Sequence, residues 1–285
     1  MRIVDFRIPP RMEEAQRVLA ELGPRGLPLA GGTSVEFVPG KDERVAVDIT
    51  RLGLGGIRAE SANFCVGATT RIAELQDYHA PGWVLDGVAP HLASQQIRNM
   101  STLGGNIARV FPWADFPVAL LALEAQMVIG GGADRVLPAD GFFEAQPARL
   151  FAPGELLKEV RITALGPGEG FAYRKEKRTA AGFSLATVAV RLALQGRHIG
   201  SARIAAGSCI PFPRRLVTAE RALAGCRPRE AEVGEAVSAG LAGVKFMENA
   251  GLSETYVEHL TRVLLRDAIL EAAQRARAGG TEETP

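Results

Sequence analysis

Cysteine is scarce in this sequence, and the three cysteines that occur are far apart. Cys65, Cys209 and Cys226 form no C-x-x-C pair, and the four histidines show no ligand spacing either. A structural zinc ion or an iron–sulfur cluster needs its ligands in close groups. An odd, scattered set of cysteines also argues against a disulfide framework. We therefore predict no metal site in this chain and interpret the cysteines as small apolar residues.

The sequence also lacks an excess of charge of one sign and any long apolar run. Its 33 Lys and Arg residues balance 32 Asp and Glu residues, for a net charge of +1. A nucleic-acid-binding protein normally shows a basic excess or stripe, which is missing here. No stretch approaches the ~18–20 apolar residues of a membrane-spanning helix, and the N-terminal segment has no signal-peptide pattern. We therefore expect a cytoplasmic protein that binds no nucleic acid and has no membrane span.

The order of apolar patterns predicts the fold class. The chain has 285 residues, 47% of them hydrophobic, which suffices for one large or two medium domains. Short apolar strands and helices follow one another without a regular βαβ alternation, which is typical of an α+β fold. In the N-terminal part the expected strands are 27–30, 45–49, 63–68, 126–129, 135–138 and 157–162. The expected helices are 12–22, 72–78, 115–125 and 83–96, the last with a bend at Pro90.

Gly166-Pro167-Gly168 marks a predicted domain boundary. After it, three strands are expected to form a small antiparallel sheet covered by three helices. The expected strands are 170–175, 184–194 and 198–206, and the expected helices are 214–223, 229–242 and 254–277. The predicted domains are 1–165, with lobes of about 1–55 and 56–165, and 170–278, followed by a disordered polar tail, 279–285.

Two glycine-rich loops are the candidates for chemistry. In the first, a strand enters Gly31-Gly32 and is followed by the hydroxyl residues Thr33 and Ser34. Glycines let a backbone turn and approach a ligand closely, and successive amides in such a turn can bind an anion. Taken alone, this pattern is a weak signal, because G-G-T-S also makes an ordinary turn.

The second loop, residues 96–107, reads Q-I-R-N-M-S-T-L-G-G-N-I. Its hydroxyl residues precede paired glycines, and an arginine lies nearby, which again suits a phosphate. Neither loop is a standard nucleotide-binding motif. Two such loops about seventy residues apart suggest a pyrophosphate held between two lobes.

These two motifs, A-G-G-T-S and I-R-N-x-x-T-L-G-G-N, resemble the FAD-binding domain of the molybdopterin dehydrogenases. That family includes xanthine dehydrogenases, aldehyde oxidoreductases and the medium subunit of carbon monoxide dehydrogenase. The resemblance covers roughly residues 1 to 275 and includes P-W-A-D-F-P at 112–117, L-L-A-L at 120–123, G-E-L-L at 154–157 and Y-R-K-E-K-R at 173–178. Arg109-Val110-Phe111 departs from the small or acidic residues of many relatives.

The resemblance implies a two-lobed, vanillyl-alcohol-oxidase-like FAD-binding domain that holds FAD non-covalently. It places the pyrophosphate on the two glycine loops, Asp115 against a polar part of FAD, and Leu157 against the isoalloxazine. The family's lysine matches Lys175, with Lys177 as the alternative. The implied FAD contacts are Leu29, Ala30, Gly31, Gly32, Thr33, Ser34, Val35, Thr69, Thr70, Ser101, Thr102, Gly104, Gly105, Asn106, Asp115, Leu157 and Lys175.

Structural roles for some of these residues remain open at this point. Asp115 could cap a helix, alone or together with a cofactor contact. Leu157 could be an ordinary core residue. Trp113 and Tyr173 could stack on a flavin, although core or interface packing is the more common role of such rings.

The resemblance also implies a function. The chain would be the flavin subunit of an oxidoreductase, and we nominate no catalytic residue because FAD performs the redox chemistry. Electrons would arrive from [2Fe–2S] clusters on a small partner subunit, after oxidation of the substrate at a molybdopterin centre on a large partner subunit. They would leave to NAD+, oxygen or another acceptor, and the complex would be a dimer of heterotrimers. The alternatives are a stand-alone FAD oxidoreductase of the same fold and a binding module that has lost its flavin.

Overall fold

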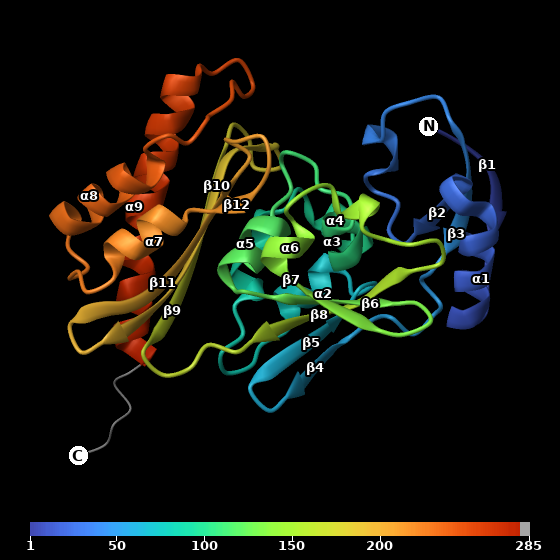
Figure 1. The fold of residues 1–285 in the computed structure, drawn as a ribbon, viewed down its shortest axis with the longest axis horizontal. Helices are drawn as coiled ribbons and strands as arrows, with labels where there is room; N and C mark the ends of the chain where they lie inside the picture. The colour runs from blue at the N-terminus through green and yellow to red at the C-terminus, as the bar shows by residue number, and fades with distance from the viewer. Residues whose placement is uncertain (280–285) are drawn as a thin grey trace. The chain divides into compact units, whose positions relative to one another are not determined.

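The computed structural model describes residues 1–279, so the predicted tail lies, from residue 280 onward, outside the described residues. The chain forms two compact units (Figure 1). Unit 1 comprises Met1–Tyr78, Ser94–Val110 and Gln126–Ile162. Unit 2 comprises His79–Ala93, Phe111–Ala125 and the chain from Thr163 onward. The packing units are therefore interleaved in sequence, whereas the division proposed from the sequence follows the chain.

Unit 1 begins with a three-stranded parallel sheet of order β1-β3-β2. Its strands are β1 (Arg2–Arg7), β2 (Gly26–Leu29) and β3 (Glu43–Asp48). Helix α1 (Met12–Leu22) connects β1 to β2 and buries Ala15 and Leu19 against Val47 and Leu156. The helix has the predicted bounds and ends at Gly23, whose φ of 52° suits only a residue without a Cβ. The sequence did not predict β1.

A five-stranded sheet of order β4-β5-β8-β6-β7 completes the strands of unit 1. It consists of β4 (Ile57–Glu60), β5 (Asn63–Gly67), β6 (Gln126–Gly130), β7 (Arg135–Pro138) and β8 (Leu156–Thr163). The remaining helical elements of unit 1 are short. They are α2 (Ile72–Asp77), α3 (Gln95–Met100), α4 (Leu103–Ile107), α6 (Ala139–Phe142) and the 3-10 turns η1 (Gly23–Arg25), η2 (Val35–Phe37) and η5 (Pro147–Arg149).

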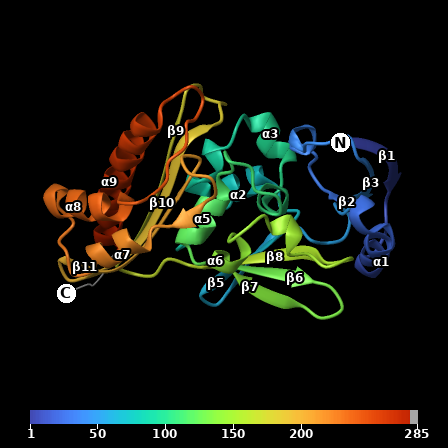
Figure 2. The ribbon, with the colours of Figure 1, turned by 45° about the horizontal axis from the view of Figure 1, so that its top comes forward.

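Unit 2 contains the predicted antiparallel sheet, extended by a short fourth strand, in the order β12-β11-β10-β9. Its strands are β9 (Glu169–Lys177), β10 (Ser184–Gln195), β11 (His198–Gly207) and β12 (Arg214–Arg215). Helices α7 (Val217–Leu223), α8 (Glu230–Leu241) and α9 (Glu254–Gly279) cover one face (Figures 1 and 2). Side chains alternate along a strand, so Val188, Val190 and Leu192 enter this helix-covered core together.

Helix α5 (Phe116–Ala122) packs against β10, β11 and β12 of the same sheet. A Cβ on Gly207 would meet the Val118 side chain at 2.5 Å, so the glycine permits this close packing. All seven residues of α5 are buried. The remaining helical elements of unit 2 are the 3-10 turns η3 (Leu85–Gly87) and η4 (Ala89–His91).

Three predicted helices differ from the structure. The helix expected over 83–96 is wrong: η3 and η4 occupy this stretch, and α3 begins only at Gln95. Pro90 has no amide to donate, and Ala93 has a φ of +40°, so a continuous helical hydrogen-bond ladder cannot pass. The helix expected over 214–223 begins only at Val217 because Arg214 and Arg215 pair with the edge of β11. The helix expected over 115–125 is shorter, and its end at Ala122 is followed by Glu124 with a φ of +50°.

No helix among residues 1–279 is both long and apolar enough to cross a membrane.

Candidate functional site: a cavity between two glycine loops

The first glycine loop follows directly from the end of β2. Gly32 has a φ of +70°, and its carbonyl accepts a hydrogen bond from the Val35 amide at 3.2 Å, which closes a tight turn. Within residues 1–279, the amides of Gly32, Thr33 and Ser34 have no hydrogen-bond acceptor. Three neighbouring amides without acceptors form the type of concave donor group that binds phosphate oxygens.

The second loop is held rigidly by α4 and by β5. The Thr102 hydroxyl caps α4 by accepting from the Gly105 amide at 3.1 Å. The Gly104 amide donates to Ala68 O at 2.8 Å, and a Cβ on Gly104 would lie 2.7 Å from that oxygen. A glycine is therefore required at position 104 because the backbone passes too close for any side chain.

The two loops touch each other. A Cβ added to Gly31 would lie 2.0 Å from Met100 O, so only glycine permits this approach. Thr33 Oγ1 and Ser101 Oγ share a hydrogen bond of 2.8 Å across 68 residues of sequence. The structure thus brings together the two motifs that the sequence singled out separately.

Thr70 bonds to the second loop, and the Thr69 amide donates to Leu54 O at 2.8 Å. The Thr70 side chain is fully buried and donates to Gly56 O at 3.0 Å, while its own carbonyl accepts from the Leu103 amide at 2.9 Å. Neither threonine is among the residues that line the cavity beside the loops. Their contact with FAD stays a prediction, and we interpret Thr70 as a support of the second loop.

The cavity beside the two loops has a volume of about 570 Å³ and lies entirely within unit 1. This volume is in the ~300–1,000 Å³ range of small-molecule sites. Thirteen of the seventeen predicted residues line it, and all except Leu157 belong to the glycine loops. They are Leu29, Ala30, Gly31, Gly32, Thr33, Ser34, Val35, Ser101, Thr102, Gly104, Gly105, Asn106 and Leu157.

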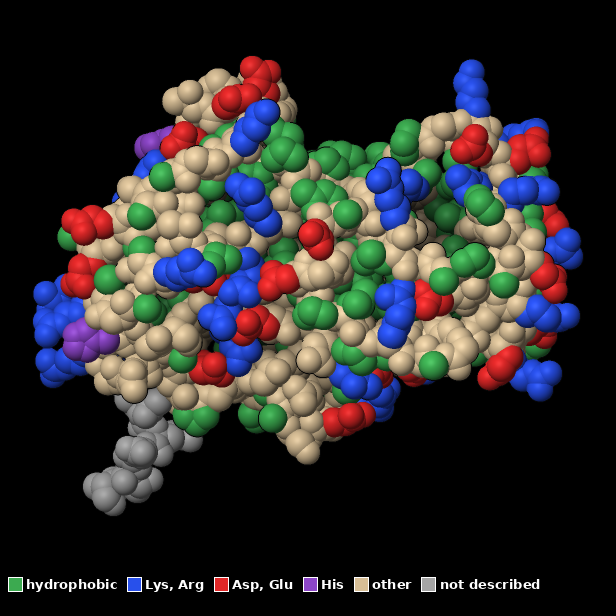
Figure 3. Space-filling view, viewed as in Figure 1, with side chains coloured by type: hydrophobic (Ala, Val, Ile, Leu, Met, Phe, Trp, Pro, Cys, Tyr) green, Lys and Arg blue, Asp and Glu red, His purple; other side chains and the backbone are tan. Residues whose placement is uncertain are grey.

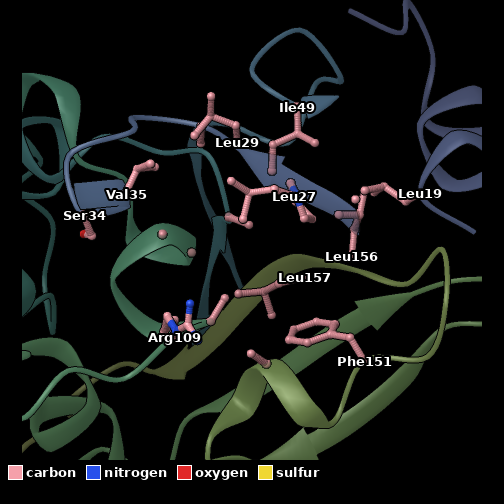
Figure 4. Close-up of a pocket in the computed structure, with 18 of the residues that line it drawn as sticks. Leu19, Leu27, Leu29, Ser34, Val35, Ile49, Arg109, Phe151, Leu156 and Leu157 are labelled. Atoms are coloured by element: carbon pink, nitrogen blue, oxygen red, sulfur yellow. The ribbon is translucent and has the colours of Figure 1, made fainter. Parts of the chain in front are cut away.

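The rest of the lining is largely apolar and escaped the sequence analysis. Figure 4 shows Leu27 and Ile49 on the side of the parallel sheet and Leu157 and Phe151 facing them from the side of β8. Leu157 is 5% exposed, so its role as a core residue and its role as a cavity wall coincide. These positions resemble ordinary core residues in the sequence, and only the fold shows that they surround a cavity.

Charged groups enter the cavity at several points. Arg109, which departs from the family pattern, is one of the lining residues (Figure 4). Glu155 also lines it, but Arg135 binds its carboxylate at 2.7 and 2.9 Å. The hydrogen bonds from Arg135 hold the pKa of Glu155 below its usual value, with a smaller contribution from the Ala152 amide. Glu155 is therefore a paired carboxylate, and its charge is balanced.

The cavity has backbone amide donors at the glycine loops and apolar side chains along its other walls, and this combination fits FAD. The diphosphate requires donors and close backbone approach, which the glycine loops provide. The rings require apolar walls, which the leucines and Phe151 provide. The residues present therefore fit this cofactor.

Asp115 and Lys175 belong to unit 2, where they form an ion pair of 2.8 Å. Their side chains are 4% and 3% exposed. Tyr173 donates its hydroxyl to Asp115 at 2.5 Å, and burial raises the pKa of that tyrosine well above its ordinary value. Asp115 occupies the N-cap position of α5, but its side chain makes no capping hydrogen bond. It interacts with Lys175 and Tyr173 instead.

His91 lies beside this buried group. Its ring is 5.3 Å from the Tyr173 ring, and its carbonyl accepts from Lys175 Nζ at 3.3 Å and from Lys177 Nζ at 3.2 Å. Burial lowers the pKa of His91, and the positive charges of Lys177 and Lys175 lower it further against the opposing effects of Asp115 and Glu271. Sequence analysis gave no signal for this residue, because His91 reaches the group only through the tertiary fold.

The aromatic rings named in the sequence have packing partners within unit 2. Trp113 stacks on Phe111 with centroids 5.2 Å apart and contacts Phe183 at 4.4 Å. Among residues 1–279, no group of three or more His, Cys, Asp or Glu side chains is arranged to hold a metal ion.

Two family models match the chain. A model described as the FAD-binding domain in molybdopterin dehydrogenase matches residues 3–164. A second, the C-terminal domain of the carbon monoxide dehydrogenase flavoprotein, matches residues 171–272. Together they span almost the whole chain and leave a gap at the predicted boundary.

Individual relatives agree with these models. The carbon monoxide dehydrogenase medium chain of Afipia carboxidovorans is 30% identical over 284 residues, which cover 96% of this chain and 98% of the relative. The 6-hydroxypseudooxynicotine dehydrogenase complex subunit alpha of Paenarthrobacter nicotinovorans is 29% identical over 96% and 95% of the two chains. A structure of carbon monoxide dehydrogenase from Hydrogenophaga pseudoflava superposes with a TM-score of 0.90 at 30% identity and covers 96% of this chain and 98% of that one.

Proposed function

This chain belongs to the family of FAD-binding medium subunits of the molybdopterin dehydrogenases, and from that premise we propose that it relays electrons within a molybdenum hydroxylase complex. Electrons would reach its FAD from [2Fe–2S] clusters on a small partner subunit. The FAD would pass them to NAD+, oxygen or another acceptor. The organic substrate would react at the molybdopterin centre of a large partner subunit, in a dimer of heterotrimers.

The contact between the two glycine loops is the observation that supports this proposal most directly. Met100 O would collide with any side chain at position 31, and Thr33 bonds Ser101 at the same junction. The amides of Gly32 to Ser34 are left without acceptors beside this junction in the described part of the chain. Such an arrangement suits a diphosphate better than it suits a solvent-exposed turn.

In this proposal the loops at 30–35 and 101–106 bind the diphosphate of FAD, and Leu157 packs against its ring system. When bound, FAD supplies two-electron and one-electron redox chemistry. The chain binds and orients the cofactor and excludes water from its apolar part through Leu27, Leu157 and Phe151. We assign no general acid or base to any residue.

Asp115 and Lys175 are proposed as the polar partners of FAD in unit 2. Their mutual ion pair and the Tyr173 hydroxyl fix both side chains in one geometry. A preorganised cation can stabilise negative charge that develops on a reduced cofactor. Lys175 is preferred over Lys177 because Lys175 forms the buried ion pair, while Lys177 donates to the backbone carbonyls of His91 and Ala180.

The FAD site is tested with Leu157→Ala and a matched core variant, Leu192→Ala. Both side chains are buried, at 5% and 1% exposure, but only Leu157 lines the cavity. Each truncation should lower the free energy of unfolding by ~2–5 kcal/mol. Only Leu157→Ala should also weaken FAD binding, by about tenfold, measured by quenching of flavin fluorescence at a temperature where both variants are folded. Equal FAD affinity in the two variants would contradict the assignment of the cavity.

The relay role is tested by reconstitution. FAD-loaded chain alone should not oxidise an organic substrate of the complex, and activity should return only when both partner subunits are added. Turnover of an organic substrate by the isolated chain would instead establish a stand-alone flavin oxidoreductase. A chain that binds no FAD at any concentration would support the binding module.

A further inference from the structure

Unit 2 contains a cavity lined by arginines that the proposed function does not use. It has a volume of about 320 Å³ and is lined by Gly196 and four arginines, Arg197, Arg227, Arg229 and Arg277. We refer to it as the arginine cavity. No acidic side chain is among its lining residues. Figure 3 shows a group of basic side chains beside a histidine at the left edge of the molecule.

The arginines come from three separate segments of unit 2. Arg197 lies in the β10–β11 turn, where Gly196 has a φ of +62°. Arg227 and Arg229 lie in the connection before α8, and Arg277 lies in the last turn of α9. All four arginines are exposed, but they come from different elements and line one cavity, whereas a basic stripe would occupy one face of one helix.

Backbone hydrogen bonds fix the connection that presents Arg227 and Arg229. The Gly225 amide donates to Ile199 O, and the Ile199 amide donates to Cys226 O, both at 2.8 Å. These bonds tie the connection to the start of β11. The Arg229 amide also donates to Arg227 O at 2.8 Å. The two arginines are therefore carried by an ordered backbone, which reduces the entropy lost on binding a ligand.

These arginines have no carboxylate partner among residues 1–279, unlike many arginines of the same unit. Arg191, Arg215 and Arg262 each form an ion pair of 2.9 Å or less. Around the arginine cavity, Arg227 Nε contacts His198 Nε2 at 3.4 Å. The nearest acidic contact is Glu232, whose carboxylate accepts from the Arg227 backbone amide at 2.7 Å and not from a guanidinium group.

The positive charges of the four arginines around this cavity repel one another. Binding of a multivalent anion would reduce that repulsion. Planar guanidinium groups bind phosphate oxygens in bidentate pairs. A volume of about 320 Å³ suits a small molecule and not a protein segment. We propose that the arginine cavity binds a compact multivalent oxyanion of the diphosphate class.

The experiment uses the FAD-loaded chain, so that the probe cannot occupy the glycine-loop cavity. Inorganic pyrophosphate is titrated by calorimetry at about 50 mM ionic strength, with sulfate as the comparison anion. We expect saturable one-to-one binding of pyrophosphate that is at least about tenfold tighter than binding of sulfate. Because a charge-assisted hydrogen bond contributes the equivalent of about tenfold in affinity or more, Arg227→Gln/Arg229→Gln should weaken the binding by about a hundredfold.

The matched control is Arg17→Gln/Arg221→Gln, which removes the same two charges from exposed positions outside every described cavity. Its pyrophosphate affinity should stay within about twofold of the unmodified chain. Arg197→Gln provides a single substitution in a turn if the double variant does not fold, and it should weaken binding by about tenfold. Non-saturable binding, equal losses in the control, or sulfate binding as tightly as pyrophosphate would each overturn the proposal. The flavin content, read from its absorbance, should be the same in all variants.

Discussion

Thr33 Oγ1 lies 2.8 Å from Ser101 Oγ, and this hydrogen bond joins two glycine loops that are 68 residues apart in sequence. Both side chains also line the cavity that we assign to FAD. The bond therefore links the formation of the site to the folding of unit 1. Removing either hydroxyl leaves the other without its partner.

A double-mutant cycle measures this link. Thr33→Val and Ser101→Ala should each lower the free energy of unfolding by about 0.5–1.5 kcal/mol, because a hydrogen bond in a protein contributes this much. The double variant should lose less than the sum of the two, since the second substitution removes no further bond. Denaturant unfolding of the FAD-free chain gives the four free energies. Strict additivity would mean that the bond does not contribute to stability.

Gly31→Ala tests the close approach of the loops. The new Cβ would lie 2.0 Å from Met100 O, so the loops must separate, at an expected cost of ~1–3 kcal/mol. FAD affinity should fall as well, because Gly31 lines the cavity. Gly132→Ala is the matched control, since a Cβ there meets nothing within 4 Å. Thermal unfolding and FAD titration of both variants provide the comparison, and equal behaviour would refute the steric argument.

Lys175→Met tests the buried ion pair of unit 2. It leaves Asp115, 4% exposed, without its cation, and removing one partner of a buried pair typically costs ~3–5 kcal/mol. Lys177→Met should cost less, because Lys177 donates to the backbone carbonyls of His91 and Ala180, whereas Lys175 holds the buried Asp115 carboxylate. The double variant Asp115→Asn/Lys175→Met should recover part of the loss. Urea unfolding distinguishes these outcomes, and a larger effect of Lys177→Met would reverse the assignment of the family's lysine.

His91 should make the stability of the chain sensitive to acid. Its pKa in the folded protein is lowered, mainly by burial and also by Lys177 and Lys175. The unfolded chain therefore binds a proton first as the pH falls, and the contribution of neutral His91 is present above about pH 6.5 and lost below it. Stability should fall as the pH drops below about 6.5, and His91→Asn should flatten this part of the profile. Unfolding of both chains is followed at each pH, and an equally steep loss of stability in His91→Asn would contradict the role of His91.

The local patterns of the chain already determined several parts of the fold. The amphipathic spacing and Gly23 set both ends of α1, and the apolar alternation after Gly168 predicted the antiparallel sheet. The paired glycines also marked the two loops in the sequence. Only glycine permits the turns and the close backbone contacts that the loops make. Helix prediction failed at 83–96 and 214–216, where Pro90 and pairing with the edge of β11 override the apolar pattern.

The sequence by itself therefore determined the two motifs, the α+β class and the resemblance that named the cofactor, since each depends on residues close together in the chain. Only the tertiary structure decided that Gly31 contacts Met100, that Leu27 and Phe151 line the same cavity, and that Lys175 pairs with Asp115. It also showed that Thr69 and Thr70 are not among the residues that line this cavity. Contacts between distant segments depend on how sheets and helices pack, and local patterns of residues do not specify that packing.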